Sequence, residues 1–309
     1  MIEVCNLVKR YGDLIALDHF NLEVQDGEIF GLLGPNGSGK TTAINCMLSL
    51  LKYDKGEIKL FGEPMSPNCY HLKRKIGVVM QNVAVFNELT VRENIDYFCG
   101  LYVPEKRKRE PLVKEAIEFT GLTEFEKFLP KKLSGGLLRR LNIACGIAHK
   151  PELIFLDEPT VAVDPQSRNN ILEGIRELNR QGATIIYTSH YMEEVEQLCS
   201  RIMIMDKGKA IATGTKEELK AMIRTGETIT IEVYNLSRTL LGQIRKLEYI
   251  LQAEYTDNHL TVRCSNGGQH LINLLDLLRQ NNCDFGSVFS EPPTLNDVFL
   301  EITGKHLRD

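Results

Sequence analysis

Several features that would assign this chain of 309 residues to a particular protein class are missing from its sequence. No stretch approaches the roughly 20 consecutive apolar residues that a membrane-spanning helix needs. The N-terminal segment has no basic region followed by an apolar one, so no secretory signal is visible. We therefore expect the protein to reside in the cytoplasm.

Patterns typical of metal sites and disulfide frameworks are also missing. The 8 cysteines are scattered along the chain, and no two of them form a C-x-x-C pair. The 7 histidines show no spacing typical of metal ligands. In a chain of this length, that distribution favours reduced and mostly buried thiols over a zinc site or a disulfide framework.

An excess of positive charge is the third missing feature. The chain has 37 Lys and Arg against 41 Asp and Glu, which gives a formal net charge of −4. This balance argues against a protein whose main role is to neutralise a nucleic-acid backbone, and we expect no nucleic-acid partner. The basic run at residues 106–109 is best explained as a solvated surface or a loop tip.

The sequence does contain short apolar runs that alternate with helical patterns. Such runs are typical of strands buried on both faces, so we expect an α/β fold built on a parallel sheet. Residues 2–8 and 20–24 alternate apolar and polar side chains, which predicts an antiparallel strand pair. The apolar runs are residues 29–33, 153–156, 184–188 and 202–205.

Two further regions differ from this pattern. Residues 83–150 contain several helical patterns and little strand signal, which predicts a helical subdomain. From residue 226 onward, strand and helix patterns follow in the order βαββαβ, which is the ferredoxin-like arrangement, and one more helix follows. With about 150 residues per domain as a guide, we predict a first domain over 1–225 and a small α+β accessory or regulatory domain over 226–309.

A glycine-rich loop follows the first apolar run and precedes a helical pattern. Residues 34–41 fit G-x-x-x-x-G-K-[ST], in which glycines let backbone N–H groups turn toward phosphates at a helix N-terminus. We expect Lys40 to lie along the β- and γ-phosphates of a nucleoside triphosphate, and the Thr41 hydroxyl to bind Mg²⁺. The residues expected to bind the nucleotide here are Gly34, Pro35, Asn36, Gly37, Ser38, Gly39, Lys40, Thr41 and Thr42.

Acidic residues end the apolar run 153–156. Ligands bind beyond the carboxyl ends of strands in parallel sheets, so this pair should lie beside the glycine-rich loop. We assign Asp157 to Mg²⁺ and Glu158 to the general base that polarises an attacking water. His190 ends the next apolar run and would lie near the γ-phosphate, although a lone histidine in this position is more often structural.

The string Leu133-Ser134-Gly135-Gly136 completes a set of motifs. Together with the glycine-rich loop, the acid pair and His190, in that order, it resembles the nucleotide-binding subunit of an ABC transporter over residues 2–220. The resemblance implies a P-loop ABC-type ATPase domain with a parallel sheet core, an antiparallel β subdomain and a helical subdomain. It also implies ATP and Mg²⁺ as cofactors.

The resemblance assigns roles to further residues. Tyr11 would stack on adenine, and Gln81 would sense both Mg²⁺ and the membrane partner and contribute to catalysis. Asp164 lies in the segment that matches the D-loop and would contribute to nucleotide binding. The Ser134 hydroxyl and the amides of Gly135 and Gly136 would contact the γ-phosphate held by a second subunit.

Partners also follow from the resemblance. One chain supplies one phosphate loop and one LSGG string, so two chains should pair head to tail, as a homodimer that encloses two ATP molecules. The tail at residues 293–304 is similar to that of ATPases in the drug and antibiotic exporter branch, the ABC-2 type. Those ATPases pair with separate permease subunits, which would place this chain on the inner face of the cell membrane.

The sequence departs from the family pattern just after the LSGG string, and two other functions are alternatives to that of a transporter ATPase. Leu137 stands where many members carry Gln, which should remove polar contacts to the nucleotide but leave the Ser and Gly donors. A soluble ABC ATPase acting on ribosomes or nucleic acid is the first alternative; the single ATPase domain and the net charge disfavour it. The second is a nucleotide-binding regulator without turnover, which the full set of Lys40, Asp157, Glu158 and His190 disfavours.

Overall fold

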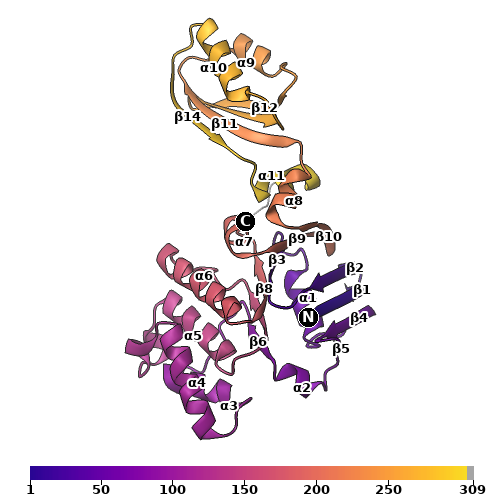
Figure 1. The fold of residues 1–309 in the computed structure, drawn as a ribbon, viewed down its shortest axis with the longest axis vertical. Helices are drawn as coiled ribbons and strands as arrows, with labels where there is room; N and C mark the ends of the chain where they lie inside the picture. Colours follow the sequence, from indigo (N-terminus) through magenta and orange to yellow (C-terminus); the bar gives the residue numbers. More distant parts are fainter. Residues whose placement is uncertain (305–309) are drawn as a thin grey trace. The chain divides into compact units, whose positions relative to one another are not determined.

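The computed structural model describes residues 1–304 and divides the chain into two compact units (Figure 1). The first unit comprises Met1–Thr215, and the second begins at Lys216. The sequence-based boundary after residue 225 falls inside the second unit, at the start of β11 (Thr225–Val233). The division lies earlier because α8 (Lys216–Ala221) packs against α11 (Leu295–Thr303), a helix of the second unit.

A six-stranded sheet in the order β10-β9-β3-β8-β7-β6 forms the centre of the first unit. Neighbouring strands are parallel except for the antiparallel pair β9 and β10, and β3, β7 and β8 are buried along their whole length. The predicted α/β fold with a parallel core is therefore confirmed. The strands are β3 (Ile29–Leu33), β6 (Ile76–Val79), β7 (Leu153–Asp157), β8 (Thr184–Ser189), β9 (Arg201–Asp206) and β10 (Lys209–Gly214).

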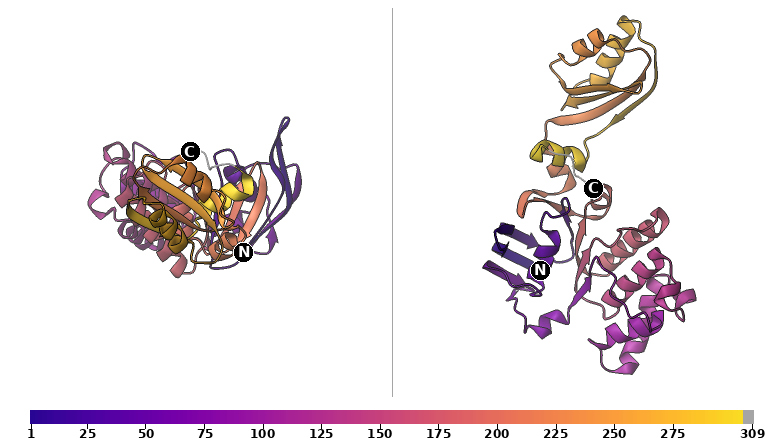
Figure 2. Two further views of the ribbon diagram at one scale, coloured as in Figure 1. Left: turned by 90° about the horizontal axis from the view of Figure 1, so that it is seen from above. Right: turned by 180° about the vertical axis from the view of Figure 1, so that it is seen from behind.

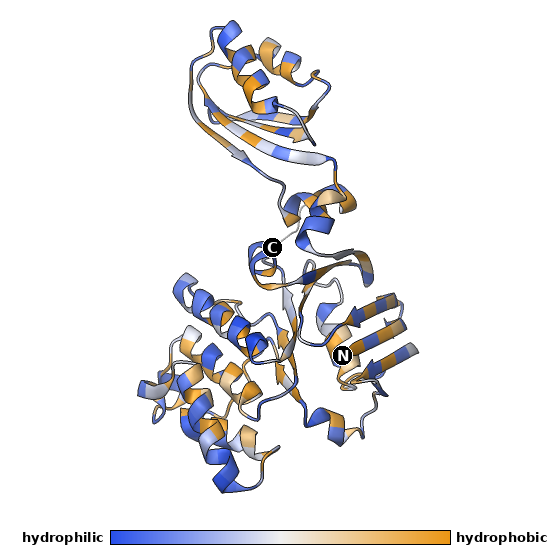
Figure 3. Cartoon of the chain, in the orientation of Figure 1, coloured by the Kyte–Doolittle hydropathy of each residue, from blue (hydrophilic) through white to orange (hydrophobic). Residues whose placement is uncertain are grey.

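An antiparallel sheet in the order β2-β1-β4-β5 lies beside this core. Figure 3 shows the alternation of hydrophobic and hydrophilic residues along β1 and β2, which is the pattern that predicted them. Helix α1 (Lys40–Met47) contributes Ile44 and Met47 to one apolar core with residues of both sheets. The strands are β1 (Ile2–Tyr11), β2 (Leu14–Val24), β4 (Lys55–Leu60) and β5 (Glu63–Pro64), and α2 (Tyr70–Lys73) follows them.

The helical subdomain contains α3 (Val91–Gly100), α4 (Lys106–Phe119) and α5 (Gly135–Ile147), which share their own apolar core. In Figure 1 and in the right view of Figure 2, this subdomain and the antiparallel sheet of β1 and β2 lie on opposite sides of the six-stranded sheet. The short helices η1 (Thr123–Phe125) and η2 (Pro130–Lys132) precede α5, and α6 (Pro165–Arg180) and α7 (Met192–Leu198) complete the unit.

The basic run at residues 106–109 forms the first turn of α4, so it is not a loop tip. The prediction of a solvated surface is wrong for Arg109, whose side chain is 15% exposed. Its guanidinium donates to both carboxylate oxygens of Asp96 on α3, at 2.7 and 3.1 Å. Arg109 therefore fastens α4 to α3.

The second unit contains the predicted βαββαβ arrangement. Its antiparallel sheet has the order β12-β13-β11-β14, and Leu240 of α9 and Leu274 of α10 belong to its apolar core. The elements after β11 are α9 (Arg238–Ile244), β12 (Ile250–Thr256), β13 (His259–Ser265), α10 (His270–Gln280) and β14 (Phe285–Glu291), followed by α11. Among the described residues, no helix is long and apolar enough to cross a membrane.

Candidate active site

The glycine-rich loop connects the buried strand β3 to α1. Gly39 precedes α1 with φ 106°, and a Cβ atom at this position would lie 2.7 Å from the carbonyl oxygen of Ala16. A Cβ at Gly34 would meet the carbonyl oxygen of Met205. Because only glycine fits both positions, the residue types of the motif follow from the backbone path. Asn36, Gly37 and Ser38 lie in the same loop, and Thr41 and Thr42 lie in the first turn of α1.

Lys40 is the first residue of α1, and its ammonium group turns back onto the loop. The Nζ atom donates to the carbonyl oxygens of Gly34 at 2.7 Å and Pro35 at 3.2 Å, and it lies 3.5 Å from Glu158 Oε1. Burial lowers the pKa of Lys40, and the Glu158 carboxylate opposes that shift. The Ser38 hydroxyl in the same loop is buried and has no hydrogen-bond partner within the described residues, which suits a loop that accommodates a polar ligand.

Asp157 is the last residue of β7, and its carboxylate is hydrogen-bonded to both α1 and β8. Its Oδ2 atom accepts a hydrogen bond from the Thr41 hydroxyl at 2.8 Å, and its Oδ1 atom accepts one from the Thr188 hydroxyl at 2.6 Å. A hydroxyl and a carboxylate are the hard oxygen ligands that Mg²⁺ prefers, and Mg²⁺ is usually completed by substrate phosphates and waters. The described residues contain no cluster of three or more His, Cys, Asp or Glu side chains that could bind a metal by itself. Thr41 and Asp157 therefore fit a metal that arrives with a nucleotide.

Glu158 is the point at which the predicted catalytic residues meet. Its Oε2 atom accepts a hydrogen bond from Gln81 Nε2 at 3.1 Å and lies 3.4 Å from His190 Nδ1, while Oε1 faces Lys40. The His190 contact lacks hydrogen-bond alignment, and its Nδ1 atom is buried without a partner in the described structure. Glu158 adopts φ 48°, and its backbone N–H donates to the Thr188 hydroxyl at 3.0 Å. Such left-handed backbone is uncommon for a residue other than glycine, and this bond helps to hold it.

The LSGG string lies at the start of α5, where Ser134 caps the helix by accepting a hydrogen bond from the Leu137 N–H at 3.3 Å. A Cβ atom at Gly136 would lie 2.5 Å from the Ser167 hydroxyl and 3.2 Å from Asp164 Oδ2. Asp164 in turn caps α6 by accepting from the Ser167 N–H at 2.9 Å. The structure therefore packs the LSGG glycine directly on the D-loop aspartate.

These two segments are separate from the phosphate loop. In the described part of the chain, no hydrogen bond or ion pair joins residues 134–136 or Asp164 to residues 34–42. Tyr11 is also separate from Glu158: it ends β1, its side chain is 48% exposed, and Lys9 Nζ lies 4.9 Å from its ring centroid. Of the predicted site, one chain thus assembles the phosphate loop, the acid pair, Gln81 and His190.

Sequence reasoning missed Arg139, which holds the backbone around the catalytic residues. This side chain of α5 is 3% exposed and donates to the carbonyl oxygens of Gln81 at 2.7 Å and Pro159 at 2.7 Å. It also donates to the carbonyl oxygens of Met80, Asp157 and Glu158. Burial lowers the pKa of this guanidinium, and the Asp157 carboxylate opposes the shift. Every residue has a backbone carbonyl group, so the acceptors of Arg139 cannot be recognised from their residue types. No sequence motif could therefore have indicated this role.

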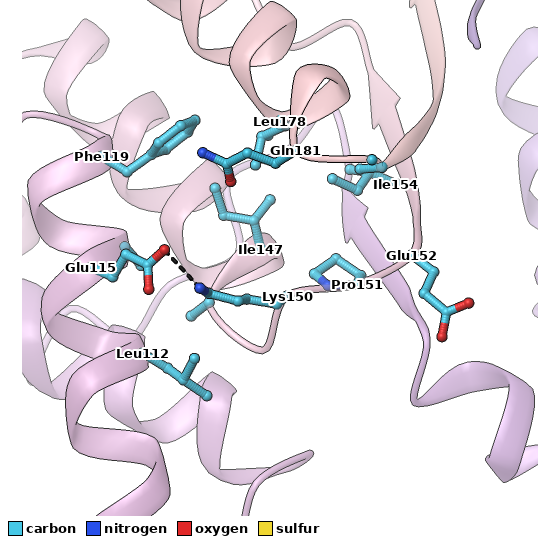
Figure 4. A pocket seen from close by; sticks show the side chains of 14 residues that line it. Leu112, Glu115, Phe119, Ile147, Lys150, Pro151, Glu152, Ile154, Leu178 and Gln181 are labelled. Carbon is cyan, nitrogen blue, oxygen red and sulfur yellow. Dashed lines mark ion pairs between the residues drawn. The ribbon is translucent and has the colours of Figure 1, made fainter. Parts of the chain in front are cut away.

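A cavity of about 500 Å³ lies elsewhere in the first unit, between the helical subdomain and the ends of β7 and α6. Leu112, Phe119, Ile147 and Leu178 line it, and Lys150 pairs with Glu115 at its edge, 2.7 Å apart (Figure 4). No residue of the predicted site lines this cavity. It is therefore not the site of the phosphate loop.

Comparisons with known proteins place this geometry in a family. A family model described as ABC transporter matches residues 17–161. The linearmycin resistance ATP-binding protein LnrL of Bacillus subtilis (strain 168) is 38% identical over 322 residues, which cover 100% of both chains. The chain belongs to the ABC transporter ATP-binding proteins. It binds and hydrolyses ATP as the ATP-binding subunit of an ABC transporter.

Other comparisons agree with this membership. The Nod factor export ATP-binding protein I of Burkholderia thailandensis is 35% identical and covers 100% of this ABC ATP-binding protein and 98% of its own length. A solved dimer of an ATP-binding cassette in a post-hydrolysis state, bound to ADP and Pi, has a TM-score of 0.64 and 27% identity, over 70% of this chain and 98% of its own. These similarities favour the transporter interpretation over a soluble ATPase acting on ribosomes or nucleic acid.

The second unit of this ABC ATP-binding protein has relatives of its own. A family model described as ATP-binding protein DrrA1-3-like, C-terminal domain, matches residues 214–303. The match begins close to Lys216, where the structure begins its second unit. The predicted resemblance to the drug and antibiotic exporter branch is confirmed.

Proposed function

We propose that this protein couples ATP hydrolysis to export through separately encoded permease subunits. The relatives that cover nearly the whole chain are named for linearmycin resistance, daunorubicin resistance and Nod factor export. The observation that carries the ATPase mechanism is the meeting of Lys40, Gln81 and His190 at the Glu158 carboxylate.

In this mechanism, Glu158 is the general base. Its carboxylate lies at the end of β7, where it can accept the proton of a water that attacks the γ-phosphate. Lys40 binds the β- and γ-phosphates once its bonds to the loop carbonyls are exchanged for bonds to ATP, and His190 donates to the γ-phosphate. Thr41 and Asp157 would hold Mg²⁺, with Gln81 as an additional ligand, and the metal would neutralise phosphate charge.

We further propose a head-to-tail homodimer. Ser134, Gly135, Gly136 and Asp164 have no bond to the phosphate loop of their own chain in the described structure. The helix N-terminus at Gly135 is suited to bind an anion, so a second chain could supply the γ-phosphate that it contacts. Two chains paired about a two-fold axis would satisfy both sites at once.

A permease-docking surface fits the exposed apolar side chains at Phe86 and on α3. Phe86 and Tyr97 contact each other with ring centroids 4.8 Å apart, yet Phe86 is 42% and Tyr97 46% exposed. Leu101, one helical turn after Tyr97, is also exposed. Exposed apolar side chains gathered in this way are typical of protein interfaces. Docking there would hold the chain on the cytoplasmic face of the membrane, with no nucleic-acid partner required.

The substitution Glu158→Gln tests the general base. We expect ATP binding to persist, hydrolysis to fall by about a hundredfold or more, and an ATP-bound dimer to accumulate, as measured by phosphate release and by size-exclusion chromatography with light scattering. Glu152→Gln, at the other end of the same strand, is the matched control and should hydrolyse ATP at the wild-type rate. Wild-type turnover in the Glu158→Gln protein would refute the assignment.

The trapped variant also tests the partner. Tagged Glu158→Gln protein, purified from detergent-solubilised membranes of its host and analysed by mass spectrometry, should recover a membrane protein with several spans. Recovery of ribosomal proteins or nucleic acid without a membrane protein would contradict the export function.

A further inference from the structure

A second carboxylate is buried behind the catalytic residues and contacts none of them. Glu194 lies on α7 and is 3% exposed. Its Oε2 atom accepts hydrogen bonds from three hydroxyl groups, those of Tyr187 at 2.6 Å, Thr160 at 2.8 Å and Ser189 at 3.1 Å. Its Oε1 atom lies 3.2 Å from Arg168 Nε on α6, an ion pair without hydrogen-bond alignment. One side chain thus joins four separate segments of the first unit.

The partners of Glu194 adjoin catalytic residues in the sequence. Thr160 follows Glu158 by two residues, and Ser189 immediately precedes His190. The Ser189 hydroxyl also accepts a hydrogen bond from the Tyr191 N–H at 2.9 Å, and this bond spans His190. These bonds fix the backbone that carries Glu158, the proposed general base, and His190, which we call the switch histidine.

Arg168 extends the connection to the D-loop. Its backbone N–H donates to the carbonyl oxygen of Asp164 at 2.9 Å, one helical turn earlier on α6. Its guanidinium lies 4.7 Å from the ring centroid of Tyr191, the residue after His190. The Glu194 carboxylate therefore connects the D-loop helix to both catalytic segments.

The Glu194 cluster differs in its energetics from ordinary apolar packing. Burying a carboxylate is unfavourable unless it is paired and fully hydrogen-bonded, and apolar side chains of similar volume would stabilise the fold at least as well. What the carboxylate adds is geometry, because each hydroxyl has a single proton to donate and donates it to Oε2 of Glu194. Because the Glu194 cluster links the segments that carry catalytic residues, a change in its geometry would change the rate of ATP hydrolysis.

We propose that Glu194 is a positioning residue for ATP hydrolysis, which holds the segments of Glu158, His190 and the D-loop in one arrangement without touching the nucleotide. The inference rests on the proposed roles of Glu158 and His190. The phosphate loop makes no bond to Glu194 in the described structure. We therefore expect a substitution of Glu194 to lower turnover and to leave ATP binding unchanged.

The test compares Glu194→Gln with Glu193→Gln, a matched substitution at the exposed neighbouring position. The glutamine keeps the size of the side chain but places an amide where Arg168 needs a carboxylate oxygen. We expect kcat to fall about tenfold, since misplacement of catalytic groups by a fraction of an ångström has effects of this size. The KM for ATP should stay within about twofold. Glu193→Gln should match the wild-type protein in both constants.

A double-mutant cycle with His190→Ala shows whether Glu194 acts through the switch histidine. If it does, the double variant loses little more turnover than His190→Ala alone, because the group being positioned is already gone. If the two losses multiply, Glu194 does not act through His190, and the part of the proposal that concerns His190 is overturned. Should Glu194→Gln fail to fold, Thr160→Val removes a single hydroxyl donor and should lower kcat about threefold with the KM for ATP unchanged.

Two further results would overturn the proposal, for different reasons. Turnover in Glu194→Gln equal to that in Glu193→Gln, while His190→Ala is impaired, would refute the role of Glu194 alone. Full turnover in both His190→Ala and Glu158→Gln would remove the proposed catalytic roles and the inference built on them.

Discussion

Replacement of Arg139 by methionine should destabilise the first unit strongly, although the two side chains are similar in length. The guanidinium donates to five backbone carbonyl groups, those of Met80, Gln81, Asp157, Glu158 and Pro159. Each buried carbonyl left without a partner costs about 1–3 kcal/mol, but the backbone relaxes and water replaces part of the loss. Breaking a buried charged network by removing one member costs about 3–5 kcal/mol, and we expect Arg139→Met to fall in this range.

The assay is urea unfolding followed by far-UV circular dichroism, because the chain has no tryptophan to report on unfolding by fluorescence. Arg140→Met is the matched control, since the adjacent side chain has a single carbonyl acceptor, that of Thr120 at 3.4 Å. We expect a loss below about 1 kcal/mol for the control. ATP hydrolysis should fall with Arg139→Met even where the protein is folded, because Gln81 and Glu158 lose their backbone anchor. An Arg139→Met loss no larger than the Arg140→Met loss would refute the reasoning.

Two more predictions concern the loop and the dependence of stability on pH. Gly39→Ala should abolish ATP binding in a fluorescent-nucleotide titration, because the Cβ would lie 2.7 Å from the Ala16 carbonyl oxygen at φ 106°; retained affinity would contradict the predicted strain. Burial lowers the pKa of His149 to about 4, below the value near 6.5 of an unfolded chain, so stability is lost as pH falls from about 6.5 to about 4. The substitution His149→Phe can keep the stack on Tyr102, and it should reduce this pH-dependent loss of unfolding free energy by about 1–3 kcal/mol. Parallel curves of unfolding free energy against pH for the two proteins would contradict the assignment of the loss to His149.

The phosphate loop and the acid pair, whose residues are neighbours in the chain, could be predicted from residue types alone, whereas the role of Gln81 followed only from the family resemblance. The phosphate loop needs glycine at fixed steps because backbone must pass close to backbone, as at Gly39 and Ala16. Asp157 and Glu158 follow directly from the end of a buried run, which β7 confirms. In such segments the spacing of residue types along the chain determines the local geometry. One sequence is therefore sufficient to predict this part of the site.

The missed residues act across long separations in the chain. Arg139 bonds carbonyl groups near residues 80 and 158, and any residue can offer a carbonyl. Glu194 accepts hydrogen bonds from three hydroxyls on two other segments, β8 and the loop after β7. Two adjacent glutamates on a helix indicate ordinary solvated charge until the burial of one of them is known. The same reason explains the boundary of the second unit: α8 belongs there because of its packing on α11, which no local pattern reports.

The way Arg139 holds its neighbours bears on how interchangeable the helical subdomain is among related ATPases. Its five acceptors are main-chain oxygens, so the catalytic core needs no particular side chain to receive it. A transplanted subdomain that has arginine at the position of Arg139 in α5 would find its acceptors already in place. Chimeras that keep this arginine should therefore keep a bonded active site without compensating changes in the core, whichever permease surface the transplanted helices present.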